Sequence, residues 1–438
     1  MSNGFIKDKN GNEKFEAFEL VKLMTHGAKL IDGTFDKRFP LVCAAGMRIK
    51  GKLDLNKMEK AINKGYKDID TMRSVLNMDD PDDLYFMIKE SYEYRLSELI
   101  PDGSDADERY ENAKKEVQHN VFQREYYKDR ACHIEVYKLD ENDHFFTIAI
   151  DHGMADGQGM LLVLKKLILD YIGLPGGGKI NKHSLLDFYQ FYEDFKNNGV
   201  MEQNTAYWNK AAEGLDGLYS YNGPLEDNKI SEDEKLVIIP MSTIKQACKN
   251  YKTTAGNLVI AAYMAAISNV YSTNESVITC VSANRSVPEF FDTAVLQLDP
   301  MLLRTPVPKD DTDVKAYLKS VMMTTSEGMK HTPSFYSKVK YSHFLFSYAQ
   351  DLTKGMSVTS IPGFDVTSWM PQTIPEHVFD INYIFLIAFE QKDSLELHFA
   401  LDDSVYCRTD FIKLVNTMKG FFEKLSSEKD LTMKDMMQ

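Results

Sequence analysis

The feature that most constrains the fold is a succession of two strands, a polar turn and an apolar helix in the first half of the chain. The segments CHIEVYKL and HFFTIAI predict neighbouring β-strands joined by DEND. The polar turn DHGMADGQG follows directly and opens the helix MLLVLKKLILDYI. This succession predicts an α/β architecture, with the polar turn at the point where a strand becomes a helix.

The same alternation precedes this unit. The segment LVCAAGMRIKG predicts a strand that leads through Asp54 into a helix. Leu55, Met58 and Ile62 share one face of that helix, and we expect it to stop at Gly65.

The second half of the chain repeats the α/β character. Four helices are predicted there first: LLDFYQFYEDF, AYWNKAAEGL, STIKQACKNYK and AGNLVIAAYMAAISNVY. The strands VITCVSANR, YIFLIAFE and SLELHFALD follow, and then a terminal amphipathic helix. The clustered Gly and Pro of GLPGGGK, residues 173–179, predict a linker. We therefore expect two lobes, residues 1–175 and residues 176–438.

Composition excludes several classes of protein. The chain has 438 residues, of which 43% are hydrophobic, so it can bury a large core. Its formal net charge of −14 and the lack of dense Lys/Arg stripes argue against nucleic acid as a partner. The first residues contain no signal-peptide core and no later stretch is long enough for an integral membrane segment, which favours a cytoplasmic location. The five cysteines, which include no C-x-x-C, predict buried free thiols.

The strongest candidate site is the H-x-x-x-D-G pattern of the polar turn, formed by His152, Asp156 and Gly157. An imidazole at a strand end can take a proton from an alcohol or amine while a carbonyl is attacked. It must be neutral to do so, as histidine is at physiological pH when its pKa is not raised. The alternative is a surface-turn histidine followed by an Asx-type turn at Asp156, because a single base without a partner proves little.

Asp156 is either a second proton carrier or a structural anion. We favour the structural role, because a carboxylate beneath a helix start can pair with a buried guanidinium and so hold the loop. The best candidate partner is Arg285, which ends the strand VITCVSANR. The alternative is a solvated Arg285.

Other motifs are incomplete. Residues 173–179 fit G-x-x-x-x-G-K, but Ile180 follows where a phosphate-binding loop needs Ser or Thr. Residues 157–159 open a helix as a dinucleotide fingerprint would, but the third glycine position is Leu162. There is no H-E-x-x-H and no G-x-S-x-G, so we expect neither a metal nor a serine nucleophile. We assign one aromatic cluster to helix packing: Phe188, Tyr189, Phe191, Tyr192 and Phe195.

Five segments, in order, resemble the condensation-domain branch of the chloramphenicol-acetyltransferase-like superfamily of CoA-dependent acyltransferases. That superfamily also contains alcohol acetyltransferases, polyketide-associated acyltransferases and plant BAHD enzymes. The resemblance covers most of the chain. The segments are GKLDLNKMEKAINKG, HFFTIAIDHGMADGQGMLLVLKKL, AYWNKAAEGL, TTAGNLVIAAYMAAI and VFDINYIFLIAFEQKDSLELHFALDDSVY.

The resemblance implies two similar lobes, each a mixed sheet with helices, that together form a pseudo-dimer. It also implies a tunnel between the lobes, which the acyl donor and the acceptor enter from opposite faces. It implies that His152 deprotonates or orients the acceptor and that Asp156 is structural. It further implies that the backbone N–H of Gly157 faces the developing oxyanion and that Arg285 pairs with the aspartate. No cofactor would be tightly bound, and the co-substrate would be a thioester on coenzyme A or on the phosphopantetheine of a separate carrier protein.

Two departures refine the resemblance. Condensation domains usually carry two histidines at the start of the motif, whereas Asp151 stands in the first position here, which makes strict peptide condensation less certain. The segment Asp365–Trp369 does not match the BAHD D-F-G-W-G box, which disfavours a plant-type enzyme.

We therefore expect an acyltransferase that acylates a small-molecule alcohol or amine. The first alternative is a non-catalytic module of the same fold that binds a carrier protein or ligand. The second is an unrelated α/β hydrolase with a cysteine nucleophile, which would need an activated thiol.

Overall fold

The computed structural model describes residues 6–7, 13–17, 42–77, 84–123, 130–174, 180–215, 218–219, 229–282, 285, 287–333, 342–349, 363–369, 371, 384–401 and 406–437. Contacts between residues divide the chain into two compact units. The first comprises Met1–Asn198, Arg285–Leu298 and Leu352–Val378, and the second comprises Gly199–Asn284, Asp299–Asp351 and Phe379–Gln438. The predicted lobes, 1–175 and 176–438, stay a prediction, and residues 175–179 of the predicted linker lie outside the described residues.

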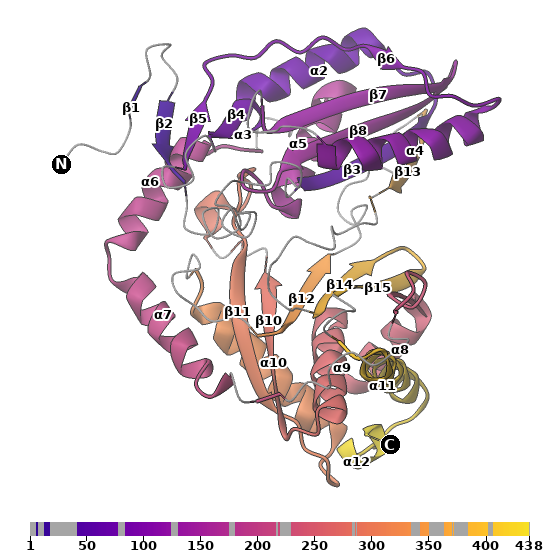
Figure 1. The fold of residues 1–438 in the computed structure, drawn as a ribbon. Helices are drawn as coiled ribbons and strands as arrows, with labels where there is room; N and C mark the ends of the chain where they lie inside the picture. The colour runs from indigo at the N-terminus through magenta and orange to yellow at the C-terminus, as the bar shows by residue number, and fades with distance from the viewer. Residues whose placement is uncertain are drawn as a thin grey trace. The chain divides into compact units, whose positions relative to one another are not determined.

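A five-stranded sheet forms the centre of the first unit (Figure 1). Its strands are, in spatial order, β13 (Asp365–Trp369), β3 (Val42–Lys50), β8 (Asp143–Asp151), β7 (Cys132–Asp140) and β6 (Glu98–Leu99). Neighbouring strands are antiparallel, except that β6 is parallel to β7. The predicted hairpin of β7 and β8 is confirmed.

Helices cover both faces of this sheet. Helix α4 (Ala106–Gln123) packs against a face that includes Ala44, Phe145 and Ala149. Helices α2 (Leu55–Asp68) and α5 (Gly157–Ile172) pack against each other and lie on the other face. Strand alternation explains this division, because successive side chains of a strand point to opposite faces.

The prediction that the first helix stops at Gly65 is wrong, since α2 continues to Asp68. Gly65 is buried, and a Cβ built on it would lie 2.6 Å from Cδ2 of Leu167 on α5. The glycine therefore allows two helices to approach closely.

A second sheet of the first unit is small and antiparallel. Its strands are, in spatial order, β1 (Ile6–Lys7), β2 (Glu13–Glu16), β5 (Tyr85–Ile88) and β4 (Ser74–Asn77), and the short helix α3 (Asp70–Arg73) precedes β4. Helix α6 (Leu185–Lys196) carries the aromatic cluster. The ring of Phe188 lies 5.3 Å from that of Phe290, which belongs to the 3₁₀ turn η3 (Pro288–Phe290), as expected for helix packing.

The second unit contains a mixed six-stranded sheet. Its strands are, in spatial order, β11 (Asp299–Pro306), β10 (Glu275–Ser282), β12 (Phe344–Ala349), β14 (Ile384–Glu390), β15 (Ser394–Leu401) and β9 (Leu236–Pro240). Strand β12 is parallel to both β10 and β14, and the remaining pairs are antiparallel.

Helix α9 (Ala255–Val270) is central to this unit, because every residue from Leu258 to Ser268 is buried. Its Tyr263 hydroxyl donates to the carbonyl oxygen of Ile384 on β14 at 3.1 Å. The other helices among the described residues of this unit are α7 (Val200–Ala211), α8 (Met241–Tyr251), α10 (Val314–Lys330), α11 (Arg408–Ser427) and α12 (Met433–Met436). In the part of the chain that the structure describes, no helix combines the length and the apolar character required to cross a lipid bilayer.

Candidate active site

The H-x-x-x-D-G pattern occupies the turn between β8 and α5, as the sequence predicts. Asp151, the last residue of β8, organises this turn. Its carboxylate accepts a hydrogen bond from the Gly153 N–H at 2.7 Å, and its carbonyl oxygen accepts from the N–H groups of Met154 and Ala155. The chain is therefore held in one tight conformation around His152.

His152 is half-buried at the start of this turn. Its Nδ1 atom is shielded from solvent and has no hydrogen-bond partner among the described residues. Burial lowers the pKa of His152 below its ordinary value, because a cation loses more than a neutral ring when water is removed. A neutral imidazole whose Nε2 remains available can serve as a proton acceptor at physiological pH.

Asp156 is fully buried beneath the start of α5. Its Oδ1 accepts hydrogen bonds from the Gly159 N–H and from Nη2 of Arg285, both at 2.7 Å, and its Oδ2 accepts from the Gln297 N–H at 2.9 Å. The ion pair predicted between Asp156 and Arg285 is thus present. These three hydrogen bonds join Asp156 to the start of α5, to Arg285 and to the backbone at Gln297.

The Arg285 side chain is only 7% exposed. It also donates from Nη1 to the carbonyl oxygen of Thr293 at 2.6 Å and from Nη2 to that of Val295 at 3.3 Å. The loop carbonyl of Met154 accepts from the Leu296 N–H at 3.1 Å. Arg285 therefore joins the H-x-x-x-D-G turn to residues 293–297.

Sequence reasoning missed this segment, residues 293–297. The segment contacts Arg285, Asp156 and Met154 through backbone carbonyl and N–H groups. Such groups occur in almost every residue, so they leave no mark in the sequence. No side-chain pattern in the segment signals the role.

Two glycines at the start of α5 have different surroundings. Gly157 is exposed, a Cβ built there would meet no atom within 4 Å, and its N–H has no acceptor among the described residues. A Cβ on Gly159 would lie 3.1 Å from the carbonyl oxygen of Val295. Gly157 leaves an open N–H at a helix start, whereas Gly159 allows the segment 293–297 to pack closely.

The thiols do not fit nucleophilic chemistry. Burial raises the pKa of Cys43, which lies near Asp156 and Asp151, and those two carboxylates raise it further. Burial also raises the pKa values of Cys132, Cys248 and Cys280. A reactive cysteine needs a lowered pKa, so these four thiols argue against the cysteine-hydrolase alternative.

Among the described residues, no group of three or more His, Cys, Asp or Glu side chains could hold a metal ion. The surroundings of residues 157–159 do not fit a dinucleotide-binding site either. A dinucleotide fingerprint requires a parallel βαβ unit, whereas the preceding strand, β8, is antiparallel to both of its neighbours.

Comparison with known proteins identifies the family. The condensation-domain family model matches residues 41–437, and the chain belongs to this family. No curated protein sequence matches the chain. The condensation domain of the monacolin K polyketide synthase MokA is similar in structure, with a TM-score of 0.74 at 15% identity over 98% of this chain and 100% of that one.

Two further solved structures are similar at low identity. The starter condensation domain of rhizomide synthetase RzmA, a mutant in complex with C8-CoA, has a TM-score of 0.72 at 13% identity over 96% of each chain. The X-domain from teicoplanin biosynthesis, in complex with OxyB, has a TM-score of 0.67 at 13% identity over 96% of each chain. These likenesses confirm the predicted fold class, α/β with two chloramphenicol-acetyltransferase-like lobes. The tunnel stays a prediction.

Proposed function

We propose that this protein is an acyltransferase that moves an acyl group from a thioester to an alcohol or amine, with His152 as the general base. The observation that carries the proposal is a half-buried histidine of lowered pKa on a loop fixed by the Asp156–Arg285 pair, close in sequence to the open N–H of Gly157. The condensation-domain family supports acyl transfer as the class of reaction.

In the proposed reaction, Nε2 of His152 accepts the proton of the acceptor O–H or N–H while that oxygen or nitrogen attacks the thioester carbonyl carbon. The carbonyl oxygen becomes an oxyanion, which the Gly157 N–H stabilises. An oriented donor of this kind is typically worth about 3 to 4 kcal/mol in the transition state. When the intermediate collapses, the C–S bond breaks and the imidazolium returns the proton to the departing thiolate, which leaves as a thiol.

The donor is a thioester on coenzyme A or on a carrier protein, and no tightly bound cofactor takes part. The solved complex of RzmA with C8-CoA supports an acyl-CoA donor. In this proposal the acceptor is a small molecule, and we place the reaction in the cytoplasm. Asp156 and Arg285 hold the loop and do not touch the reacting atoms.

A second candidate is a binding module of the same fold without chemistry. The X-domain solved with OxyB favours it, because a structurally similar domain has a protein partner there. The replacement of the usual first histidine by Asp151 leaves this candidate open.

One experiment separates the two. The wild-type protein would be incubated with a panel of acyl-CoA and acyl-carrier thioesters, with and without a mixture of small alcohols and amines, while thiol release and acylated products are measured. The acyltransferase proposal predicts release that depends on acceptor and yields an ester or amide. Binding of the thioesters without release by any donor and acceptor pair would instead support the binding module.

A further inference from the structure

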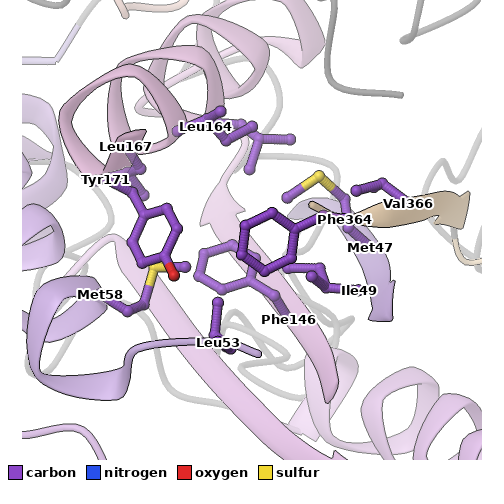
Figure 2. A pocket seen from close by; sticks show the side chains of 11 residues that line it. Met47, Ile49, Leu53, Met58, Phe146, Leu164, Leu167, Tyr171, Phe364 and Val366 are labelled. Carbon is purple, nitrogen blue, oxygen red and sulfur yellow. The ribbon is translucent and has the colours of Figure 1, made fainter. Parts of the chain in front are cut away.

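An apolar cavity lies within the first unit, between the sheet and the helices α2 and α5 (Figure 2). Its volume is about 30 Å³. Figure 2 shows side chains from β3, α2, β8, α5 and β13 around it, among them Met47, Met58, Phe146, Leu164 and Val366. The hydroxyl of Tyr171, which also lines the cavity, accepts a hydrogen bond from the Asp54 N–H at 3.0 Å. The lining therefore favours a hydrocarbon over a polar ligand.

The sheet face that lines the cavity runs back to the catalytic loop. On β3, Cys43, Ala45 and Met47 point to the same face, because side chains alternate along a strand. Met47 is paired with Phe146 at the cavity, and Cys43 is paired with Ile150, two residues before His152. Near the loop this face combines the small side chains of Cys43 and Ala45 on β3 with the buried Ile148 and Ile150 of β8, and larger side chains surround the cavity.

Helix α5 also runs from the H-x-x-x-D-G turn to the cavity. It begins at Gly157, and Leu164, Leu167 and Tyr171 line the cavity farther along. A helix rises about 1.5 Å per residue, so Leu164 lies roughly 10 Å along the axis from Gly157. A zigzag hydrocarbon with bonds of about 1.5 Å needs roughly eight carbons to span that distance.

We infer that this cavity receives the hydrocarbon end of a medium-length acyl chain while its thioester carbonyl lies at His152. The inference rests on the proposed acyl transfer and specifies the class of donor. A cavity of about 30 Å³ holds only the end of such a chain. Met47 and Met58 allow deeper entry, since unbranched, flexible methionine side chains adapt to irregular spaces.

The test uses S-alkyl coenzyme A thioethers, which have no carbonyl to transfer. Their affinities for the intact protein would be measured by calorimetry for alkyl chains of increasing length. Burial of each methylene should raise the affinity by up to about fourfold until the cavity is full, after which the affinity levels off. Leu164→Ala should move this limit to longer chains, and Val366→Ile, which adds one methylene to the cavity, should move it to shorter ones.

Leu318→Ala serves as the matched control, because Leu318 is buried on α10 in the second unit, outside the cavity lining. It should leave the limit unchanged. Affinity that does not depend on chain length, or a limit that neither cavity variant moves, would contradict the inference and leave the cavity a packing defect. Length-dependent thioether binding without any acyl transfer would contradict the proposed reaction but keep the tail site.

Discussion

At the scale of single residues, the carboxylate of Asp156 has two roles that can be separated by experiment. It caps the start of α5 through Gly159, and it neutralises the buried side chain of Arg285. Asp54 caps α2 in the same way, accepting from the Lys57 N–H at 3.0 Å, but it is exposed. Asp54 therefore provides a matched control for capping alone.

We predict that Asp156→Ala lowers the free energy of unfolding by roughly 3 to 5 kcal/mol, because it leaves a guanidinium buried without its anion. Asp54→Ala should cost only about 1 kcal/mol, the usual value of a helix cap. Urea unfolding of both variants measures the difference. Equal costs would show that Arg285 is stable without its partner.

Asp151 gives a prediction about pH. Burial raises the pKa of its carboxyl from 3.8 to about 6. Between these values the folded protein keeps a proton that the unfolded chain has lost, so this group's contribution to stability falls as the pH rises through that range.

Asp151→Asn removes the titration, and its amide oxygen can still accept from the Gly153 N–H. We expect this variant to exceed the wild type in unfolding free energy by roughly 1 to 3 kcal/mol at pH 7.5, with the gap closing near pH 4. Urea unfolding at the two pH values measures it. A gap of the same size at both would rule out titration of Asp151 as its cause.

At the scale of elements, the first turn of α5 places two glycines in opposite roles. Gly159→Ala should lower the unfolding free energy by about 1 to 3 kcal/mol, because the added methyl group meets the backbone of Val295. Gly157→Ala should keep the wild-type stability within about 1 kcal/mol and lower acyl transfer by up to roughly 10²-fold, because the methyl group occupies the open side of the proposed oxyanion site.

Thermal unfolding and transfer rates of the two glycine variants check this contrast. A Gly157→Ala variant with the wild-type rate would remove the oxyanion role from this N–H. A Gly159→Ala variant with wild-type stability would show that the segment 293–297 can move aside.

Which elements the sequence could predict depends on how local their causes are. Strands β7 and β8 and helix α5 follow from local hydrophobic periodicity and from the turn between them, and all three were predicted. The end of α2 was missed because Gly65 serves contact with Leu167, a residue distant in sequence. The pairing of Asp156 with Arg285 could be predicted because Asp156 belongs to the H-x-x-x-D-G pattern and Arg285 ends a predicted strand, whereas residues 293–297 act through their backbone.

At the scale of the whole molecule, the candidate site is assembled from distant parts of the chain within one compact unit. Asp156 and Arg285 are 129 positions apart, and Arg285–Leu298 belongs to the first unit although the stretches on either side of it belong to the second. Strand β13 likewise pairs with β3 of the first unit. The geometry around His152 therefore depends on contacts between segments that are distant in sequence.

His152 is the proposed base of the acyl transfer. The most direct measurement compares acceptor-dependent thiol release by the wild type, His152→Ala and His119→Ala, where His119 is an exposed histidine on α4. We predict that His152→Ala loses about 10²- to 10⁴-fold in rate with an unchanged unfolding midpoint, while His119→Ala keeps the wild-type rate. A His152→Ala variant that transfers acyl groups at the wild-type rate would contradict the claim.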